Sequence, residues 1–371
     1  MSLFIAAIAC LSACDNGITG FVPGFGETQP MQRRTLHHDG IEREFFVHMP
    51  ANVGDSTMQL PVVVAMHGYT STATGFQAAH NLNSHADKHG YIVVYPQGSH
   101  FGVDKPDGTQ TLITSWNDLA ANQAPSPEGP HCTIDSYDYP CPSECGECNQ
   151  CGWTSCYDDV GFIDRMLNEV QSEFSADPER IYLLGVANGG MMALRLGCNL
   201  SSRFAAVAPI NAQLAPGYAC GPQTNLPMLH IYGGEDNTVR ADGRPGNDGF
   251  MYTTAARTSE VWANAMNCKT GPKPWETEYS TALGLSCTAY SDCEDEGMVV
   301  ASCNDPDGQH EWPGQRIDSI SPTCVAPEQT DSLPGQAPCP TESREIAHQG
   351  MDLVWDFMSR YRKNSSLPTQ Q

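Results

Sequence analysis

Residues 181–196 read IYLLGVANGGMMALRL, and this stretch decides the fold. Its first four residues are apolar, which is typical of a buried strand in a parallel sheet. The residues after Gly190 are mostly helix formers, and the three glycines permit a tight turn between the two elements. This pattern matches the G-x-S-x-G nucleophile elbow, a strand-to-helix turn that exposes a serine hydroxyl. The central position is Ala187, which has no hydroxyl.

Apolar runs and helical patterns alternate on both sides of this elbow. We predict strands within 35–50 and at 61–66, 91–95, 181–184, 204–208, 228–232 and 298–302, and helices at 76–89, 158–174, 191–196, 254–266 and 346–358. Such alternation produces right-handed βαβ units and a mainly parallel sheet covered by helices on both faces. The prediction is therefore a single α/β domain over residues 35–363, with cysteine-rich insertions at about 118–157 and 315–343.

The composition and the net charge of the chain indicate which kinds of partner it can bind. The chain has 371 residues, of which 40% are hydrophobic, enough for a large core. Its net charge of −24 at pH 7 repels phosphate backbones, so we expect no nucleic-acid partner. No apolar stretch reaches the length that a transmembrane helix needs.

The N-terminal residues predict export. Residues 1–14 form a short apolar segment that ends in Leu11-Ser12-Ala13-Cys14, and residues 15–34 are rich in Gly and polar residues. An apolar segment that ends in small residues is typical of a signal peptide. The last four residues resemble a bacterial lipobox, in which Cys14 would carry the lipid. We therefore expect a secreted or cell-envelope protein with a flexible linker at 15–34, and membrane attachment through lipidated Cys14 is one form of this prediction.

The cysteine count also favours export. Sixteen cysteines are present, and fourteen remain once Cys10 and Cys14 are assigned to the signal and the lipid. An even number in an exported chain predicts disulfides. The C-x2-C-x2-C spacing at 145–151 is also compatible with zinc or iron–sulfur ligation, but disulfides are favoured. The pairs that we expect first are Cys198–Cys220 and Cys324–Cys339.

Polar residues follow other predicted strands, at the sheet edge where sites of parallel sheets gather. His67-Gly68-Tyr69 follows 61–66, Asp236 follows 228–232, and His310 follows 298–302. A nucleophile position, an acid and a histidine occur in the chain order that α/β-hydrolases use. Glu235 is the weaker choice of acid.

Together these motifs resemble the exported α/β-hydrolases of the polyhydroxybutyrate depolymerase family, which includes feruloyl esterase-like and acetylxylan esterase-like members. The matching segments are 67–68, 93–98, 116–117, 158–163, 180–182, 185–192, 204–209, 233–236 and 310–314. The resemblance implies an α/β-hydrolase fold and Ser-His-Asp ester hydrolysis without cofactor or metal. The substrate would be a polyester or a small ester.

The resemblance also implies residue roles. His310 would be the general base and Asp236 would orient it, while the backbone N–H groups of Tyr69 and Asn188 would form the oxyanion hole. Ala187 occupies the nucleophile position.

Several side chains have two interpretations. Trp116 and Trp312 are expected to line an apolar substrate site, with buried core tryptophans as the alternative. His80, His85 and His89 lie on one predicted helix and are expected to be solvated histidines without a metal.

Ala187 leaves three explanations open, since neither His310 nor Asp236 can replace an activated alcohol. The chain is a Ser→Ala knockout, or a natural pseudoenzyme, or His310 activates water directly for slow hydrolysis. Our main prediction is an esterase scaffold of the depolymerase type that is inactive at position 187, and the alternative within the enzyme class is a feruloyl or acetylxylan esterase. The rival is a non-catalytic lipoprotein that binds an ester or a polymer.

Overall fold

The computed structural model describes residues 30–51, 58–104, 110–118, 132–136, 139–140, 142, 145–146, 152, 154–315, 322–340 and 349–363. The expected signal and Cys14 lie outside the described residues, as do most of the linker, much of the first insertion and a smaller part of the second. No helix within the described ranges is long and apolar enough to cross a membrane.

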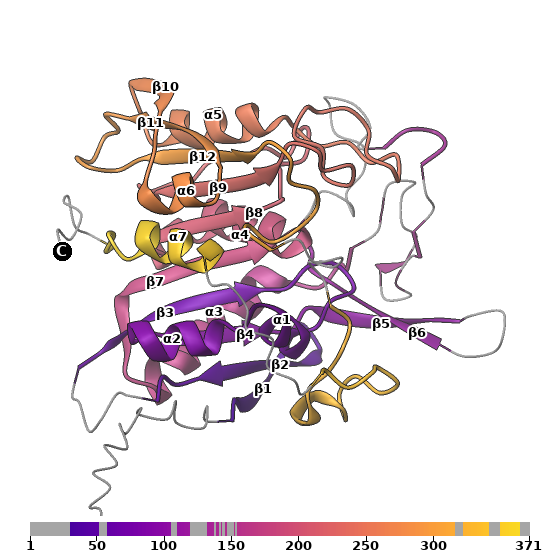
Figure 1. The fold of residues 1–371 in the computed structure, drawn as a ribbon. Coiled ribbons are helices and arrows are strands. Elements are labelled where there is room, and N and C mark those ends of the chain that lie inside the picture. The colour runs from indigo at the N-terminus through magenta and orange to yellow at the C-terminus, as the bar shows by residue number, and fades with distance from the viewer. Residues whose placement is uncertain are drawn as a thin grey trace, which may run out of the picture.

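A ten-stranded sheet runs through the middle of the molecule (Figure 1). Its spatial order is β1 (Gln32–His38), β2 (Ile41–His48), β4 (Ile92–Pro96), β3 (Leu60–Met66), β7 (Ala176–Val186), β8 (Ala206–Ile210), β9 (Met228–Gly233), β12 (Val300–Asp305), β11 (Ser286–Ser291) and β10 (Thr270–Pro274). The six strands from β4 to β12 are parallel, and antiparallel strands flank them at both edges. This topology confirms the predicted α/β-hydrolase fold.

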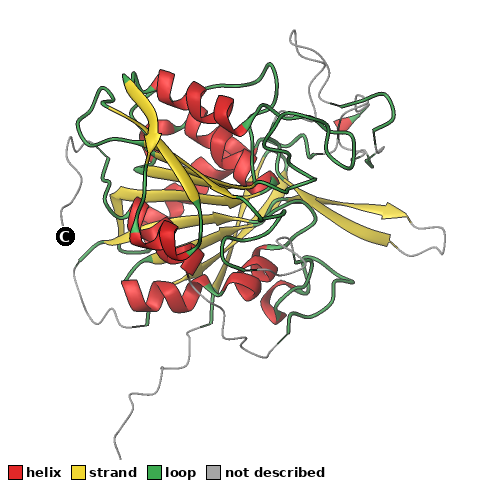
Figure 2. Cartoon of the chain, turned by 45° about the horizontal axis from the view of Figure 1, so that its top comes forward, coloured by secondary structure: helices red, strands yellow, loops and turns green. Residues whose placement is uncertain are grey.

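Helices cover both faces of the sheet (Figure 2). They are α1 (Ala73–His80), α2 (Leu82–His89), α3 (Asp159–Glu173), α4 (Asn188–Asn199), α5 (Ala255–Ala265), α6 (Glu278–Ala282) and α7 (Gln349–Met358). The central strands are fully buried because helices pack on both sides, which explains their continuous apolar sequence. Helix α3 begins where the Asp158 side chain accepts the Gly161 N–H at 3.0 Å, as an N-cap does.

Two local predictions differ from the structure, and one hairpin was not predicted. The strand expected within 35–50 is a hairpin of β1 and β2, because Asp39 and Gly40 at its turn both have positive φ. The helix expected at 76–89 is two helices, separated by Asn81 at φ 44°. A hairpin of β5 (Ser99–Asp104) and β6 (Gln110–Ser115), which we did not predict, projects from the body (Figure 1).

The expectation of solvated histidines on α1 and α2 is wrong for two of the three. His80 is 2% exposed and His85 is 1% exposed, because this side of the helices packs against the rest of the domain. His80 stacks on Trp312 with ring centroids 4.5 Å apart. His89 is half-buried at the end of α2.

Five disulfides join described cysteines: Cys145–Cys156, Cys198–Cys220, Cys268–Cys293, Cys287–Cys303 and Cys324–Cys339. Both pairs that the sequence suggested first are confirmed. Cys145 is bonded to Cys156, so it is not available as a metal ligand in the C-x2-C-x2-C segment. Disulfides of this density are typical of proteins from oxidising compartments.

Candidate active site

The elbow backbone is strained at Ala187, the N-cap residue of α4. Its φ is 50° and its ψ is −123°, a conformation that costs a non-glycine residue about 1–3 kcal/mol. The Ala187 N–H donates to the Ile210 carbonyl at 2.9 Å, and its own carbonyl accepts the Met191 N–H at 2.9 Å. The turn therefore has the geometry of a nucleophile elbow although its central side chain is a methyl group.

Close backbone packing explains the glycines around this turn. A Cβ atom on Gly185 would lie 2.2 Å from the Gly189 carbonyl oxygen. One on Gly189 would lie 2.3 Å from the His67 carbonyl oxygen. Both distances are far below van der Waals contact, so only glycine lets strand β7, helix α4 and the loop after β3 approach this closely.

Asp236 and His310 form a hydrogen-bonded pair across two loops. His310 Nδ1 lies 2.7 Å from Asp236 Oδ2, and the two side chains are 21% and 1% exposed. The other carboxylate oxygen of Asp236 accepts the N–H groups of Thr238 at 2.7 Å and Val239 at 2.9 Å. Asp236 is thus held in one orientation by its own loop, and the acceptor that it presents to His310 favours a proton on Nδ1.

Parallel strands bring the elbow and the Asp236–His310 pair to the same end of the sheet, where these strands have their carboxyl ends. Ala187 follows β7, Asp236 follows β9, and His310 follows β12. These strands lie in the order β7, β8, β9, β12 and are parallel. Their carboxyl ends are therefore neighbours at a spacing of about 4.8 Å per strand. The structure therefore places all three residues after parallel strands at the same end of the sheet, and it joins two of them, Asp236 and His310, by a hydrogen bond.

Asn211, which the sequence analysis missed, joins the acid loop to the histidine loop. Its side-chain oxygen accepts the Gly233 N–H at 3.0 Å, and its amide nitrogen donates to the Glu311 carbonyl at 2.7 Å. Asn211 is 1% exposed and has φ 46°. Asparagine tolerates this conformation better than most residues. The signal in the sequence that could have identified Asn211 was a polar residue directly after β8.

The two expected oxyanion residues lie on the loop after β3 and at the start of α4. Asn188 is the first residue of α4, where the N–H groups lack an acceptor within the helix. Its side chain accepts the Trp116 N–H at 2.7 Å and donates to the Trp116 carbonyl at 3.1 Å. Beside Tyr69, the Thr70 N–H donates to the Thr114 carbonyl at 2.8 Å and fixes the loop. Both N–H groups stay our predicted oxyanion donors.

His67 supports this loop as a neutral, buried imidazole. Its Nε2 accepts the Gly98 N–H at 2.9 Å, and its Nδ1 lies 2.8 Å from the Gly68 carbonyl, to which it donates. Burial lowers the pKa of His67 from 6.5 to about 4. These bonds hold the ring in one tautomer, and they leave it no role in proton transfer at neutral pH.

The free energy of unfolding is expected to fall between pH 7 and pH 4 because of His67 and His230. Burial lowers the pKa of both imidazoles to about 4. Below pH 6.5 the unfolded chain binds a proton at each site and the folded chain does not, so folding becomes less favourable. The loss reaches roughly 3 kcal/mol per histidine by pH 4.

Urea unfolding at pH 7 and at pH 4.5 measures this loss. His230→Gln is the matched variant, because a glutamine can still donate to the Ala212 carbonyl that His230 Nε2 contacts at 2.9 Å. Its stability should depend less on pH than that of the parent. Equal pH dependence in the two proteins would contradict the assignment.

The expectation that Trp116 and Trp312 line a substrate site differs from the structure. Trp116 is 0% exposed and Trp312 is 2% exposed. The Trp116 indole N–H donates to the His67 carbonyl at 2.9 Å. Both rings are core residues, because the loops that carry them fold inward onto the helices and strands beneath the site.

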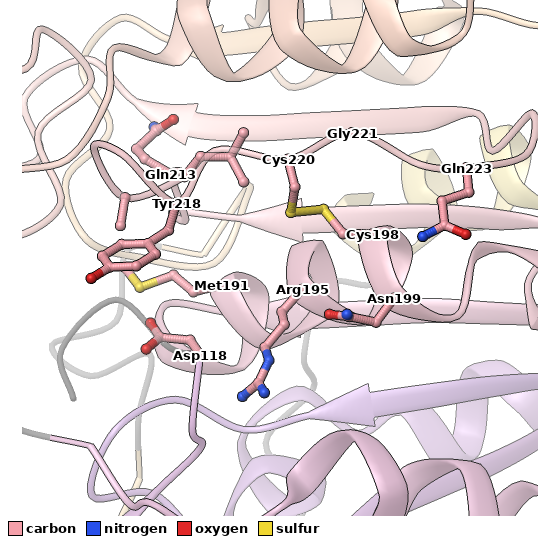
Figure 3. A pocket seen from close by; sticks show the side chains of 12 residues that line it. Asp118, Met191, Arg195, Cys198, Asn199, Gln213, Tyr218, Cys220, Gly221 and Gln223 are labelled. Atoms are coloured by element: carbon pink, nitrogen blue, oxygen red, sulfur yellow. A yellow bond between two sulfur atoms is a disulfide. The ribbon is translucent and has the colours of Figure 1, made fainter. Parts of the chain in front are cut away.

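A pocket of about 270 Å³ lies along α4, beginning one turn beyond Ala187 (Figure 3). Met191, four residues or about 6 Å along the helix axis from Ala187, is its nearest lining residue on α4. The Cys198–Cys220 disulfide ties α4 to the loop that closes the pocket. The sequence pattern did not predict this pocket, because its walls come from three separate segments of the chain.

The pocket lining combines apolar side chains with several polar and charged ones. Asp118, Arg195 and Gln213 all contribute to it. Gln213 is 1% exposed, and among the described residues neither its amide oxygen nor its amide nitrogen has a hydrogen-bond partner. Buried amides normally have partners, so Gln213 indicates a place where a ligand or water would bind.

The chain was compared with known proteins. No family model matches it. It is similar to feruloyl esterase B of Piromyces equi, with 29% identity over 41% of this chain and 29% of that protein. It is also similar to poly(3-hydroxyalkanoate) depolymerase C of Paucimonas lemoignei, with 22% identity over 62% of this chain and 45% of that protein. One similar solved structure is an acetyl xylan esterase from Aspergillus awamori, with 15% identity, a TM-score of 0.48, and 76% of this chain and 95% of that one covered.

The matches cover only part of each curated relative, but the relatives are named for the same kind of chemistry. The chain spans between 27% and 49% of the length of the curated relatives that it matches. Those relatives are named as feruloyl esterases, acetylxylan esterases and polyhydroxyalkanoate depolymerases. The relatives of this chain are therefore ester hydrolases.

Proposed function

We propose that this chain is a carboxylic-ester hydrolase scaffold that binds its ester and, with alanine at position 187, does not form an acyl-enzyme. The observation that carries the proposal is the 2.7 Å Asp236–His310 pair, which lies at the same sheet edge as the strained elbow. A strained backbone is retained where function needs it. Here the strain and the oriented histidine serve a nucleophile that the alanine does not supply.

With serine at position 187, the reaction would follow the serine-esterase course. The hydroxyl oxygen would attack the ester carbonyl carbon while His310 takes the hydroxyl proton. The carbonyl oxygen would become an oxyanion held by the N–H groups of Tyr69 and Asn188. His310 would return the proton to the leaving alcohol, and water would then hydrolyse the acyl-enzyme by the same steps. No metal or cofactor takes part in this course.

We also propose that the protein acts outside the cytoplasm. Five disulfides among the described residues support this, since such bonds persist in oxidising compartments. The apolar segment 1–14 supports export, and lipid attachment at Cys14 stays a prediction from sequence.

The polar groups in the pocket favour a sugar ester over an aliphatic polyester as the ligand. The Asp118 carboxylate can only accept hydrogen bonds at neutral pH, whereas the Gln213 amide both donates and accepts. Sugar hydroxyls supply donors and acceptors, but the interior of a hydroxybutyrate chain supplies acceptors alone. This favours the feruloyl or acetylxylan esterase alternative over the depolymerase type, with the sugar in the pocket along α4.

Binding to the alanine form tests both parts of this proposal. Because the ester is not cleaved, isothermal titration with acetylated xylo-oligosaccharides gives an equilibrium Kd. Gln213→Leu should weaken binding about 10-fold, since the sugar hydroxyl would lose its buried partner. Gln223→Leu is the matched control, because Gln223 lines the same pocket but is exposed, and its Kd should stay within about twofold.

The outcomes separate the alternatives. The depolymerase type would be supported instead if hydroxybutyrate oligomers bound more tightly than sugar esters and Gln213→Leu had no effect. No binding of either ester class would contradict the ester-binding role itself.

A further inference from the structure

A cluster of two histidines and one aspartate joins helices α2 and α7, which lie together on one face of the sheet (Figure 1). His85 and His89 are one turn apart on α2, and Asp352 is on α7. Helix α2 leads into the start of β4, so the cluster lies at the amino edge of the sheet. The candidate active site is at the opposite edge.

The geometry of the cluster is close to that of a metal site. His85 Nε2 lies 3.2 Å from Asp352 Oδ1, and His89 Nε2 lies 4.0 Å from the same oxygen. All three ligand atoms fall within 4.8 Å of one another. Zinc–ligand bonds of about 2.0–2.2 Å in a tetrahedron place neighbouring ligand atoms about 3.4 Å apart. A shift of about 1 Å at His89, which is partly exposed, would close the site.

The two imidazole rings are already aligned. Their centroids are 4.2 Å apart and the planes meet at 20°, so the rings stack nearly in parallel. Stacked histidines at i and i+4 present their outer nitrogens to one side of a helix, an arrangement that helical zinc sites use. Here Asp352 is on that side, supplied by a helix more than 250 residues further along the chain.

The Tyr91 hydroxyl contacts the second ring nitrogen of His85 and fixes the orientation of the ring, as such partners do for metal-bound histidines. His85 Nδ1 lies 2.8 Å from the Tyr91 hydroxyl. Tyr91 is fully buried and stacks on Trp355 of α7, with centroids 4.3 Å apart. If Nδ1 donates to this hydroxyl, the lone pair of Nε2 faces Asp352. Metal-ligating histidines use their second nitrogen in this way.

We propose that His85, His89 and Asp352 bind one Zn²⁺ ion, with water as the fourth ligand, and that the ion clamps the C-terminal helix α7 to α2. Imidazoles select zinc and similar transition metals over calcium and magnesium, which prefer oxygen ligands alone. The side chains of His89 and Asp352 are 27% and 21% exposed, which leaves a route for the ion and for its water. The net charge of −24 favours the approach of a cation.

Titration of the full, chelator-treated protein with ZnCl₂ tests the proposal. We expect one ion per chain and a rise in Tm on binding. His89→Ala and Asp352→Asn should each weaken binding by more than about 100-fold, and Tyr91→Phe by about 10-fold through the ring that it orients. Cobalt(II) should give the visible absorption of a four-coordinate site in the parent and lose it in His89→Ala.

Matched controls separate this site from surface binding. Lys88→Ala changes an exposed neighbour on the same helix, and His37→Ala removes an exposed histidine on β1. Both should bind zinc as the parent does. Zinc affinity that is unchanged in His89→Ala and Asp352→Asn, or lost in His37→Ala, would overturn the proposal. So would a parent protein without stoichiometric binding, which would leave the cluster as a His–Asp hydrogen bond between helices.

Discussion

Ala187→Ser is expected to raise kcat for short p-nitrophenyl esters by roughly 10⁶-fold over the parent chain. The position already has the strained φ of 50° and a methyl group at Cβ, so a serine adds one oxygen without new backbone strain. The Asp236–His310 pair is hydrogen-bonded and ready to accept the hydroxyl proton. In the predicted Ser-His-Asp arrangement, Ala187 lacks the hydroxyl oxygen, whereas Asp236 and His310 are already paired.

Steady-state hydrolysis of p-nitrophenyl acetate measures the gain, and a burst of p-nitrophenol would report the acyl-enzyme. The control is Ala187→Ser combined with His310→Ala, which should return to the background of the parent. If Ala187→Ser folds normally and stays at that background, the assignment of the elbow to a serine esterase is wrong.

The same assay separates direct activation of water by His310 from the other two explanations for Ala187. A knockout or a pseudoenzyme should have no activity that depends on His310. Direct activation of water by His310 should give slow hydrolysis in the parent that His310→Ala removes. A large gain in Ala187→Ser is compatible with each explanation, so the parent background is the informative value.

Asp236→Asn, in the Ala187→Ser protein, is expected to lower kcat by about 10⁴-fold. The N–H groups of Thr238 and Val239 donate to Oδ1 of Asp236, so an asparagine would place its oxygen there. Its NH₂ group would then face His310 Nδ1, now 2.7 Å from Oδ2. His310 would have to accept at Nδ1 and carry its proton on Nε2, where it could not take the serine proton.

Glu235→Gln in the same protein is the matched control. Glu235 is the adjacent acid, is exposed, and was the weaker sequence candidate for the same role. We expect kcat to stay within about twofold of Ala187→Ser. A large loss in Glu235→Gln with little change in Asp236→Asn would reassign the acid and contradict the geometry described above.

The buried central strands of the sheet could be predicted from the sequence, and the outermost strands could not. The runs at 61–66 and 91–95 are continuously apolar, and 228–232 is apolar except for the buried His230, because helices cover both sides of those strands. Strand β10 is mostly exposed and contains Pro272 and Pro274. It exists because it pairs with β11, and that pairing leaves no periodic pattern in its own residues.

The site shows the same division. Ala187, Asp236 and His310 each follow a predicted strand, so parallel topology alone placed them at one edge. Asn211 also follows a strand, but its role, like that of the pocket residue Gln213, depends on loops that meet only in the folded chain. Trp116 and Trp312 show the reverse case, since aromatic residues near a motif fit a core and a pocket equally well.

By itself, the sequence determined the order of the central strands and of the helices that flank them, the elbow with Ala187 at its centre, and the acid and histidine that accompany it. These features depend on local periodicity, on glycine conformations and on chain order, and each of these can be read directly from the sequence. Only the tertiary structure decided the orientation of Asp236 toward His310, the pocket along α4, and the meeting of His85 and His89 with Asp352. Each of these depends on side chains from distant segments at separations of a few ångströms, a range at which packing of the whole domain sets the geometry.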